Sequence, residues 1–215
     1  MPRTHEGLVR LIQRHGATDP RVIDAFRRVA RRDFVPPGSE HLAYGDRPVG
    51  LPQSQTTSQP SLIARMLEAA APRSSDRALE VGTGYGFQTA LLSHLVAEVV
   101  SVERRSELAE AATENLRRAG ITGVAVRHGD GFAGAPDRAP FDIIIVSAAA
   151  PLMPEALVSQ LAEGGRLVIP VRAEDASTDN VVSVTKRDGA PLPPRLITPA
   201  RFVPLVPGPV EDQAD

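Results

Sequence analysis

Residues 55–59 are five consecutive polar side chains, Gln-Thr-Thr-Ser-Gln, directly before Pro60. This density of hydroxyl and amide groups suits a polar ligand, and the hydroxyl of Ser58 could direct a reacting group. A serine two residues before a proline can also cap a helix by accepting from its free backbone amides. For Ser58 alone, capping is the favoured interpretation, whereas its polar surroundings favour a functional hydroxyl.

A glycine-rich sequence follows one expected helix later, in Glu80-Val-Gly-Thr-Gly-Tyr-Gly86. We call residues 82–86 the glycine turn. Without side chains, its glycines let the backbone approach a ligand and point amide hydrogens toward it. The dinucleotide fingerprint Gly-x-Gly-x-x-Gly would need a glycine at position 87, which is Phe87 here. The Gly-x-Gly-x-Gly spacing therefore favours S-adenosylmethionine over NAD.

Two carboxylates follow the next two expected strands. Glu103 ends the apolar run at residues 99–102, about 20 residues after the glycine turn, where an acidic residue binds ribose hydroxyls. Asp130 lies in Gly-Asp-Gly, where its carboxylate could accept from the exocyclic amine of an adenine. Both have structural alternatives, because Glu103 could solvate a strand end and Asp130 could belong to an ordinary turn. We expect both to bind the cofactor.

Composition narrows the class of protein. The 215 residues are 42% hydrophobic and 23% charged, which fits a single domain, residues 1–215. A formal net charge of −2 argues against nucleic acid as the main partner, and the arginine-rich residues 1–32 are interpreted as the solvated face of N-terminal helices. Cysteine is absent, which excludes disulfides, thiol nucleophiles and cysteine-ligated zinc.

Several motifs and segments are missing from the sequence. Neither Gly-x-Ser-x-Gly nor His-Glu-x-x-His occurs, so we expect neither a hydrolase of that type nor a metal site. The first residues lack the apolar core of a signal peptide, and no run approaches the roughly 18 apolar residues of a membrane span. We expect a cytoplasmic protein, with no membrane partner, that acts as a monomer.

The first 59 residues predict a helical cap and a loop. Apolar spacings of three and four between residues 7 and 32 predict two short amphipathic helices, split at Asp19-Pro20. Residues 36–59, which we call the Ser58 loop, hold too many prolines and glycines for a helix or a central strand, so an extended ordered loop is expected. Pro60 then opens a helix over residues 61–70.

From residue 77 onward, short apolar runs alternate with helical segments. Strands buried on both faces and joined by helices are typical of an α/β fold with a doubly wound, mainly parallel sheet. Residues 60–171 would form this Rossmann-like, nucleotide-binding core, and residues 172–206 would add antiparallel strands, including one over residues 201–206. The tail, residues 207–215, is expected to fray. The expected core strands are residues 78–81, 99–102, 124–126, 141–146 and 165–169, and the expected core helices are residues 87–96, 106–119 and 154–162.

The chain resembles the protein-L-isoaspartate O-methyltransferases over nearly its whole length. The Thr-x-Ser-Gln-Pro and Arg-Phe-Val-Pro-Leu motifs are the most specific, whereas many methyltransferases share the glycine turn. The motifs are Arg32-Asp-Phe-Val-Pro36, Tyr44-Gly-Asp-Arg-Pro48, Gln55-Thr-Thr-Ser-Gln-Pro60, Leu79-Glu-Val-Gly-Thr-Gly84, Gln88-Thr-Ala90, Val100-Ser-Val-Glu-Arg104, His128-Gly-Asp-Gly131, Phe141-Asp-Ile-Ile-Ile-Val146, Ala148-Ala-Ala-Pro151, Gly164-Gly-Arg-Leu-Val-Ile-Pro170 and Arg201-Phe-Val-Pro-Leu205.

The resemblance implies a class I S-adenosylmethionine-dependent methyltransferase fold and a repair activity. A methyl group would pass from S-adenosylmethionine to the free α-carboxylate of an L-isoaspartyl residue in damaged proteins and peptides, leaving S-adenosylhomocysteine. The two alternatives are methylation of a normal aspartate in a dedicated biosynthetic peptide, and a non-catalytic binding module with the same fold.

The resemblance also assigns roles to individual residues. Ser58 matches the family's active-site serine. The implied cofactor contacts are Thr57, Ser58, Gln59, Pro60, Glu80, Gly82, Thr83, Gly84, Gly86, Glu103, Asp130 and Gly131. The implied substrate contacts are Thr57, Ser58, Ala148, Ala149, Arg201, Phe202 and Val203.

The chain departs from the family pattern at three positions. Pro52 and Ser54 stand in a segment where many relatives read Gly-x-Gly, and loss of glycine narrows the accessible backbone. We expect a stiffer Ser58 loop. Tyr85 stands in the glycine turn, where we expect it to add bulk beside the cofactor.

Overall fold

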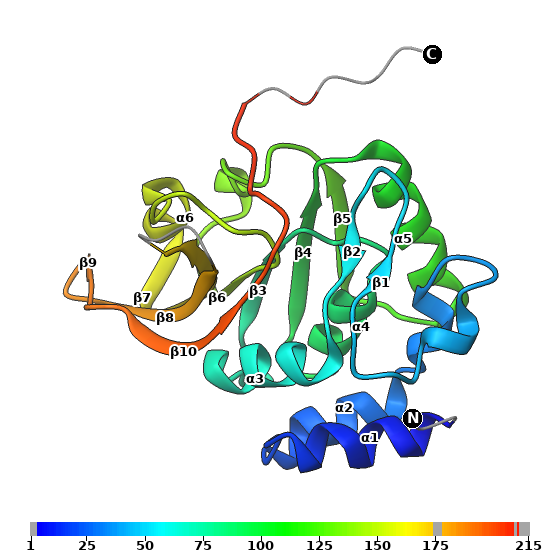
Figure 1. The fold of residues 1–215 in the computed structure, drawn as a ribbon. Helices are drawn as coiled ribbons and strands as arrows, with labels where there is room; N and C mark the ends of the chain where they lie inside the picture. Colours follow the sequence, from blue (N-terminus) through cyan, green and yellow to red (C-terminus); the bar gives the residue numbers. More distant parts are fainter. Residues whose placement is uncertain (1–3, 174–177, 209, 211–215) are drawn as a thin grey trace.

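The computed structural model describes residues 4–173, 178–208 and 210. In this part of the chain an eight-stranded sheet forms the centre, with helices on both faces and a helical cap at the N-terminal end (Figure 1). The strand order is β10-β8-β7-β6-β3-β4-β5, with β9 paired to β8 outside this path. This arrangement confirms the predicted fold class.

Five neighbouring strands are parallel, and the C-terminal strands run antiparallel to them. The parallel strands are β3 (Arg77–Val81), β4 (Glu98–Glu103), β5 (Val124–His128), β6 (Phe141–Val146) and β7 (Leu161–Arg172). The antiparallel strands are β8 (Asp179–Arg187), β9 (Ala190–Pro191) and β10 (Arg195–Ala200). The crossovers contain α4 (Phe87–Ser93), α5 (Ser106–Arg118), the 3-10 helix η3 (Pro136–Arg138) and α6 (Glu155–Ser159).

Both faces of the inner parallel strands are largely buried, whereas the edge strand β5 is only partly buried. Alternate residues such as Ala78, Ile143 and Val168 pack under the helical side of the core, whereas their neighbours Leu79 and Ile144 pack on the side that α6 covers. Burial on both faces explains why these strands read as continuous apolar runs. Each large aliphatic side chain removed from water stabilises the fold by about 1.5–3 kcal/mol.

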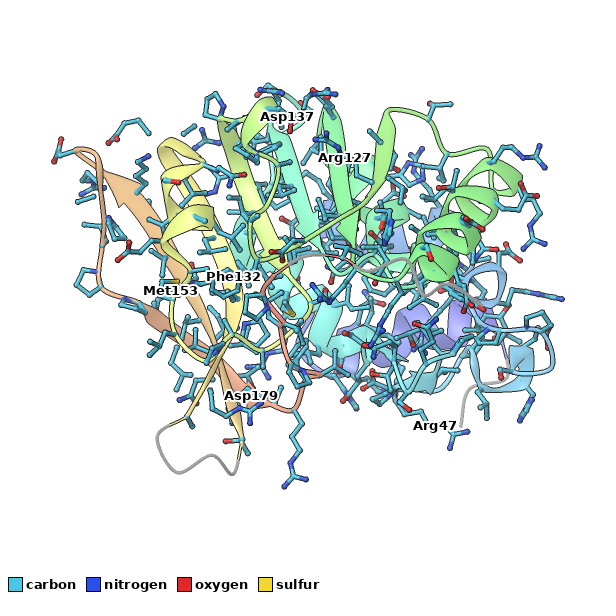
Figure 2. The ribbon with its side chains drawn as sticks, turned by 90° about the horizontal axis from the view of Figure 1, so that it is seen from above. Arg47, Arg127, Phe132, Asp137, Met153 and Asp179 are labelled. Atoms are coloured by element: carbon cyan, nitrogen blue, oxygen red, sulfur yellow. The ribbon has the colours of Figure 1, made fainter. Side chains whose placement is uncertain are left out.

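The side of the sheet that carries α6 is closed by loop residues as well. Phe132 and Met153 pack against the core cluster there, as Figure 2 shows from above. Arg127 of β5 and Asp137 of η3 form an ion pair of 2.7 Å that joins the edge strand to the next connection. Apolar packing and an ion pair therefore both stabilise the loops next to β5 and β6.

The cap consists of α1 (His5–Arg14) and α2 (Pro20–Arg28), which pack on α3 (Pro60–Ala70). The predicted split at Asp19-Pro20 is confirmed: the Asp19 side chain caps α2 by accepting from the Arg21 amide, and Pro20 is the first helical residue. Such a cap satisfies one of the free amides at a helix start.

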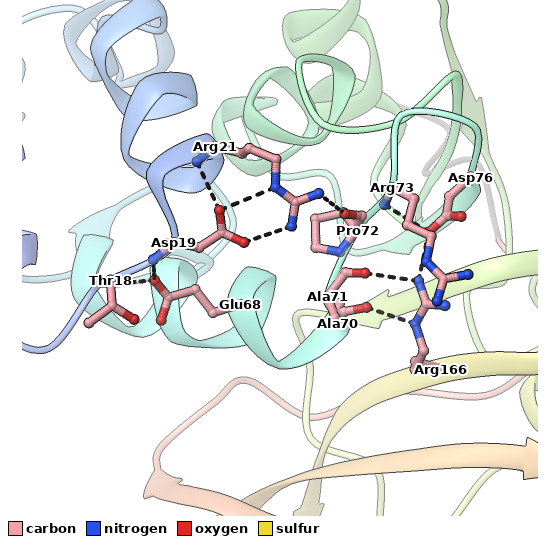
Figure 3. A network of polar contacts seen from close by, with 10 residues as sticks. All are labelled: Thr18, Asp19, Arg21, Glu68, Ala70, Ala71, Pro72, Arg73, Asp76 and Arg166. Carbon is pink, nitrogen blue, oxygen red and sulfur yellow. Dashed lines mark hydrogen bonds and ion pairs between the residues drawn. The ribbon is translucent and has the colours of Figure 1, made fainter.

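Polar contacts fix α3 between the cap and the sheet (Figure 3). The Glu68 carboxylate accepts from the amides of Thr18 and Asp19, at 2.6 and 2.7 Å. At the end of α3, the half-buried Arg166 of β7 donates to the carbonyls of Ala70 and Ala71. Because α3 is held at this end, its first turn has a defined position, and the Ser58 loop leads into that turn.

The Ser58 loop contains no α-helix and no strand of the central sheet, as predicted. It follows the 3-10 helix η1 (Arg31–Phe34), and contains η2 (Glu40–Leu42) and a two-stranded antiparallel ribbon of β1 (Val49–Gly50) and β2 (Thr56–Thr57). At the tip of the ribbon, Gln53 and Ser54 have φ angles of 55° and 58°, in the left-handed region that favours glycine. Ser54 thus adopts a glycine-like conformation.

The prediction of a strand over residues 201–206 is wrong. This segment makes only an isolated parallel bridge, between Pro204 and Ala149, within the described chain. Proline has no amide hydrogen, so Pro204 cannot donate to a ladder. The segment crosses the carboxyl end of β6 instead: Ala149 donates to the Val203 carbonyl and accepts from the Leu205 amide, both at 2.8 Å.

Helix ends also differ from expectation. The expected helices over residues 87–96 and 154–162 stop at Ser93 and Ser159, because the chain then turns into the next strand. No helix in the described ranges is both long enough and apolar enough to cross a membrane.

Candidate active site

A cavity lies at the carboxyl ends of β3, β4 and β6. The chain leaves β3 toward β4 and β5, then returns to place β6 on the other side of β3. Open α/β sheets bind ligands at such a switch point. The cavity has a volume of about 250 Å³, and residues from all three strand ends line it, including Gly82, Glu103 and Ala148. We call it the first cavity.

The glycine turn is shaped by backbone angles that other residues rarely adopt. Gly82, Gly84 and Gly86 have φ angles of 91°, 56° and 90°. A second close approach lies beside the turn, where a Cβ on Gly131 would be 2.4 Å from a methyl carbon of Val81. The backbone at both places therefore requires glycine and leaves room for a ligand.

Glu103 connects the glycine turn to β4. Its buried carboxylate accepts from the amides of Gly84, at 2.8 Å, and Arg105, at 3.0 Å, and it lines the first cavity. Burial raises the pKa of Glu103. A carboxylate held in this way still has lone pairs for two hydroxyls of a diol, so the turn and Glu103 fit the ribose end of S-adenosylmethionine.

A second cavity adjoins the first one on the side of α3 and β10. It has a volume of about 320 Å³, and its lining includes Gln59, Arg201 and Phe202. Ser58 borders both cavities. An in-line transfer between a cofactor in one cavity and a substrate in the other would therefore pass beside its side chain.

Ser58 does not cap α3. The N-cap residue is Gln59, without a capping side-chain bond, and the amide of Ser61 is satisfied by Asp46 at 2.8 Å. The Ser58 carbonyl accepts from Arg31, but its hydroxyl makes no hydrogen bond with any residue in the ranges 4–173 and 178–208. The hydroxyl is therefore available to a ligand.

Comparisons with known proteins agree with this geometry. The family model of protein-L-isoaspartate(D-aspartate) O-methyltransferase matches residues 3–209. The chain belongs to this family. A protein-L-isoaspartate O-methyltransferase from Methanoculleus marisnigri is 48% identical over 178 residues, which cover 83% of this chain and 80% of the relative. One from Koribacter versatilis is 44% identical over 195 residues, covering 91% and 86%.

Solved structures give the same result. A structure described as protein-L-isoaspartate O-methyltransferase has a TM-score of 0.84 at 29% identity, covering 96% of this chain and 67% of that chain. A Plasmodium falciparum protein, described as a candidate member of the family in complex with S-adenosyl-L-homocysteine, also has a TM-score of 0.84. It is 25% identical, and the match covers 95% of this chain and 99% of that one. The fold of this family member is thus that of S-adenosylmethionine-dependent methyltransferases.

Two of the carboxylates that resemblance assigned to the cofactor lie outside the first cavity. Glu80 is fully buried, and it accepts from Gln88, at 3.0 Å, from Ser101, at 2.6 Å, and from the Thr89 hydroxyl. Burial raises the pKa of Glu80 to about 7. Because side chains alternate along β3, Glu80 points to the face of the sheet opposite Val81. Glu80 therefore stabilises the residues around the glycine turn without lining the cavity.

Asp130 contacts the C-terminal segment instead. Its carboxylate accepts from the amides of Phe132 and Gly208, both at 2.9 Å. The neighbouring Gly131 lines the first cavity. In this family member Asp130 thus fixes Gly208, two residues after Val206, which lines the first cavity.

The other predicted contacts divide between the two cavities. The first cavity contains Thr57, Ser58, Gly82, Thr83, Gly84, Glu103, Gly131, Ala148 and Val203, together with Tyr85. The second contains Ser58, Gln59, Arg201, Phe202 and Val203. Neither cavity is lined by Pro60, Glu80, Gly86, Asp130 or Ala149.

Arg31 organises the Ser58 loop, and sequence reasoning missed it. Its fully buried guanidinium donates to the carbonyls of Ala43, Gly45, Arg47 and Ser58 and to the Thr57 hydroxyl. Burial lowers the pKa of Arg31 to about 10. Within a run of arginines at the N-terminus, nothing in the sequence singles this one out.

Proposed function

We propose that this enzyme methylates the free α-carboxylate of L-isoaspartyl residues in damaged proteins and peptides. The observation that carries the proposal is the position of Ser58. Its unengaged hydroxyl lies at the boundary between a cavity that fits S-adenosylmethionine and a second cavity beside β10 and α3.

In the first cavity, the chain would hold the cofactor through the glycine turn and Glu103. When bound, S-adenosylmethionine supplies an electrophilic methyl group, whose bond to sulfur breaks as the bond to the carboxylate oxygen forms. The side chains of Leu51, Tyr85 and Leu205 line the same cavity and give it apolar surface. In low-dielectric surroundings the attraction between a sulfonium and a carboxylate is strong.

In the second cavity, the chain would position the substrate anion. A carboxylate is already ionised near neutral pH, so no general base is required. The Ser58 hydroxyl donates a hydrogen bond to one carboxylate oxygen and leaves the other directed toward the first cavity. Its contribution is alignment, which can supply a large part of a rate enhancement.

The product ester prepares the repair step. The methoxy group of a methyl ester is a far better leaving group than the oxygen of a carboxylate. The neighbouring backbone nitrogen can therefore attack the ester carbonyl carbon, forming a C–N bond and releasing methanol. The resulting succinimide hydrolyses partly to a normal aspartyl linkage. This step requires no further residue of the enzyme.

The test supplies labelled S-adenosylmethionine with two peptides that are identical except for isoaspartate or aspartate at one position. We expect base-labile label on the isoaspartyl peptide alone. Label on the normal peptide would instead indicate an aspartate methyltransferase for a dedicated peptide. Label on neither peptide, together with no affinity for S-adenosylhomocysteine, would indicate a non-catalytic module.

We further propose that the enzyme acts as a monomer in the cytoplasm. The large apolar side chains exposed among the described residues are Leu152, Leu192, Leu196 and Val206. Leu192 and Leu196 lie close together around the start of β10, whereas Leu152 and Val206 come from other segments. The chain holds no cysteine, so its fold needs no oxidising compartment. Light scattering at micromolar concentration should give the monomer mass, and a dimer mass would contradict this proposal.

A further inference from the structure

Four residues form the boundary between the two cavities: Thr56, Ser58, Ser147 and Val203. Ser58 comes from the loop before α3, whereas Ser147 directly follows β6. The proposed reaction must occur at this boundary, because the methyl donor and the carboxylate occupy different cavities. Thr56, Ser58 and Ser147 each carry a hydroxyl at this boundary, and Ser147 is the one attached to a strand of the core.

The hydrogen bonds around Ser147 determine where its proton can point. The side-chain amide of Gln88 donates to the Ser147 oxygen at 3.0 Å and to the Glu80 carboxylate at 3.0 Å. A serine hydroxyl has one donor and two acceptor sites. Because the bond from Gln88 uses an acceptor site, the Ser147 proton must be donated elsewhere, and no residue in the described ranges accepts it.

The position of Ser147 is fixed from several directions. Its amide donates to the Val81 carbonyl at 2.8 Å, which continues the pairing of β6 with β3. A Cβ on Gly82 would lie 3.4 Å from the Ser147 Cβ, so the side chain packs closely against the glycine turn. Gln88 is only 6% exposed and Glu80 is not exposed. A buried carboxylate and amide thus orient this hydroxyl.

We propose that Ser147 is a second hydroxyl that binds the substrate carboxylate, beside Ser58. This inference rests on the proposed function and adds a residue to its site. A carboxylate oxygen has two lone pairs, so both hydroxyls can bind the non-reacting oxygen while the other stays free to attack. Hydrogen bonds to a charged acceptor are stronger than neutral ones, so Ser147 contributes mainly to binding of the anion.

The alternative partner for Ser147 is the cofactor, whose methionine end also carries a carboxylate. The lining favours the substrate, because Gly82 and Glu103 border the first cavity alone, whereas Ser147 borders both cavities. The two partners predict different losses of affinity, and an experiment can separate them.

The experiment compares the wild type with Ser147→Ala, Ser147→Thr and Ser159→Ala. Ser159 is the matched control, since its exposed hydroxyl bonds only within its own helix, to the Ala156 carbonyl. The KM for an isoaspartyl peptide and kcat are measured at saturating S-adenosylmethionine, and the Kd of S-adenosylhomocysteine is measured by calorimetry.

We expect Ser147→Ala to raise the peptide KM about tenfold, the loss expected when a bond to a charged group is removed. Its kcat should fall less than the KM rises, and its Kd for S-adenosylhomocysteine should stay within about twofold. Ser147→Thr keeps a hydroxyl, so its peptide KM should be close to that of the wild type. The KM of Ser159→Ala should equal that of the wild type.

Three outcomes would overturn the proposal. If Ser147→Ala raises the Kd of S-adenosylhomocysteine and leaves the peptide KM unchanged, Ser147 would be assigned to the cofactor. If the wild type labels the isoaspartyl peptide but Ser147→Ala leaves the peptide KM unchanged, this inference alone would be overturned. A wild type that labels neither peptide would overturn the proposed function, and this inference with it.

Discussion

The glycine turn and the Ser58 loop form opposite parts of the same site but are built differently. The glycine turn lies between two parallel strands, and its shape follows from backbone angles that its own glycines permit. The Ser58 loop has only the short 3-10 helix η2 and the ribbon of β1 and β2 as regular structure of its own. Its position depends on Arg31, which precedes the loop, and on the loop's own Asp46, which accepts from the Ser61 amide of α3. The turn is therefore a local structure, whereas the loop is a tertiary one.

The largest expected effect separates turnover from cofactor binding. Ser58→Ala should lower kcat on the order of 100-fold, comparable to removal of one aligned hydrogen-bond donor at a reacting centre. The Kd of S-adenosylhomocysteine should stay within about threefold, because the glycine turn is untouched. Single-turnover kinetics and calorimetry measure both quantities. Equal losses of both would mean that the two parts of the site do not act independently.

Removal of Arg31 tests whether the loop depends on distant contacts. Arg31→Met leaves four carbonyls and one hydroxyl without their donor, so we expect a loss of about 2–4 kcal/mol in the free energy of unfolding. Turnover should fall further than affinity for S-adenosylhomocysteine. The control is Arg32→Met, at an exposed neighbour, and urea unfolding measures the difference. Equal stability of the two variants would contradict the role of Arg31.

Glu103 tests the opposite part of the site. Glu103→Gln keeps the side-chain shape but removes the charge, so affinity for S-adenosylhomocysteine should fall about tenfold. The peptide KM should change little, because Glu103 borders only the first cavity. Glu110→Gln, at an exposed position on α5, is the control. A larger effect on peptide KM than on cofactor affinity would contradict the division between the cavities.

The buried Glu80 behind the glycine turn predicts a pH dependence of stability. Its pKa of about 7 in the folded chain lies above the ordinary glutamate value of 4.5, so the folded state binds more protons between these values. Stability should therefore fall as pH rises from about 4.5 to 7, by up to about 3 kcal/mol. Glu80→Gln should flatten this slope, as thermal unfolding across the range would reveal. A slope unchanged in the variant would contradict the assignment.

The smallest effect concerns the tip of the Ser58 loop. Ser54→Gly should stabilise the chain by about 1 kcal/mol, because it removes a left-handed serine. The same change at Ser39, where φ is −100°, should instead destabilise slightly, since glycine gains freedom in the unfolded chain. Thermal unfolding of both variants provides the comparison. Destabilisation by Ser54→Gly would show that no strain resides there.

Local patterns explain what could be predicted. Apolar runs identified the five parallel strands, and the spacing of three glycines identified the turn, because these signals lie within a few adjacent residues. Residues 201–206 were mistaken for a strand, since their apolar character is real but their single bridge to Ala149 depends on a distant strand end. Helix ends were also misplaced, because periodicity says little about where a chain must turn.

The sequence by itself determined the sheet, the glycine turn, the carboxylate after β4 and the family resemblance. These follow from chemistry that neighbouring residues carry. Only the tertiary structure placed Ser147 beside Ser58, Arg31 under the loop, and Glu80 and Asp130 outside the first cavity. Such placements depend on which distant segments come into contact when the core forms, and local sequence patterns do not reveal these long-range contacts.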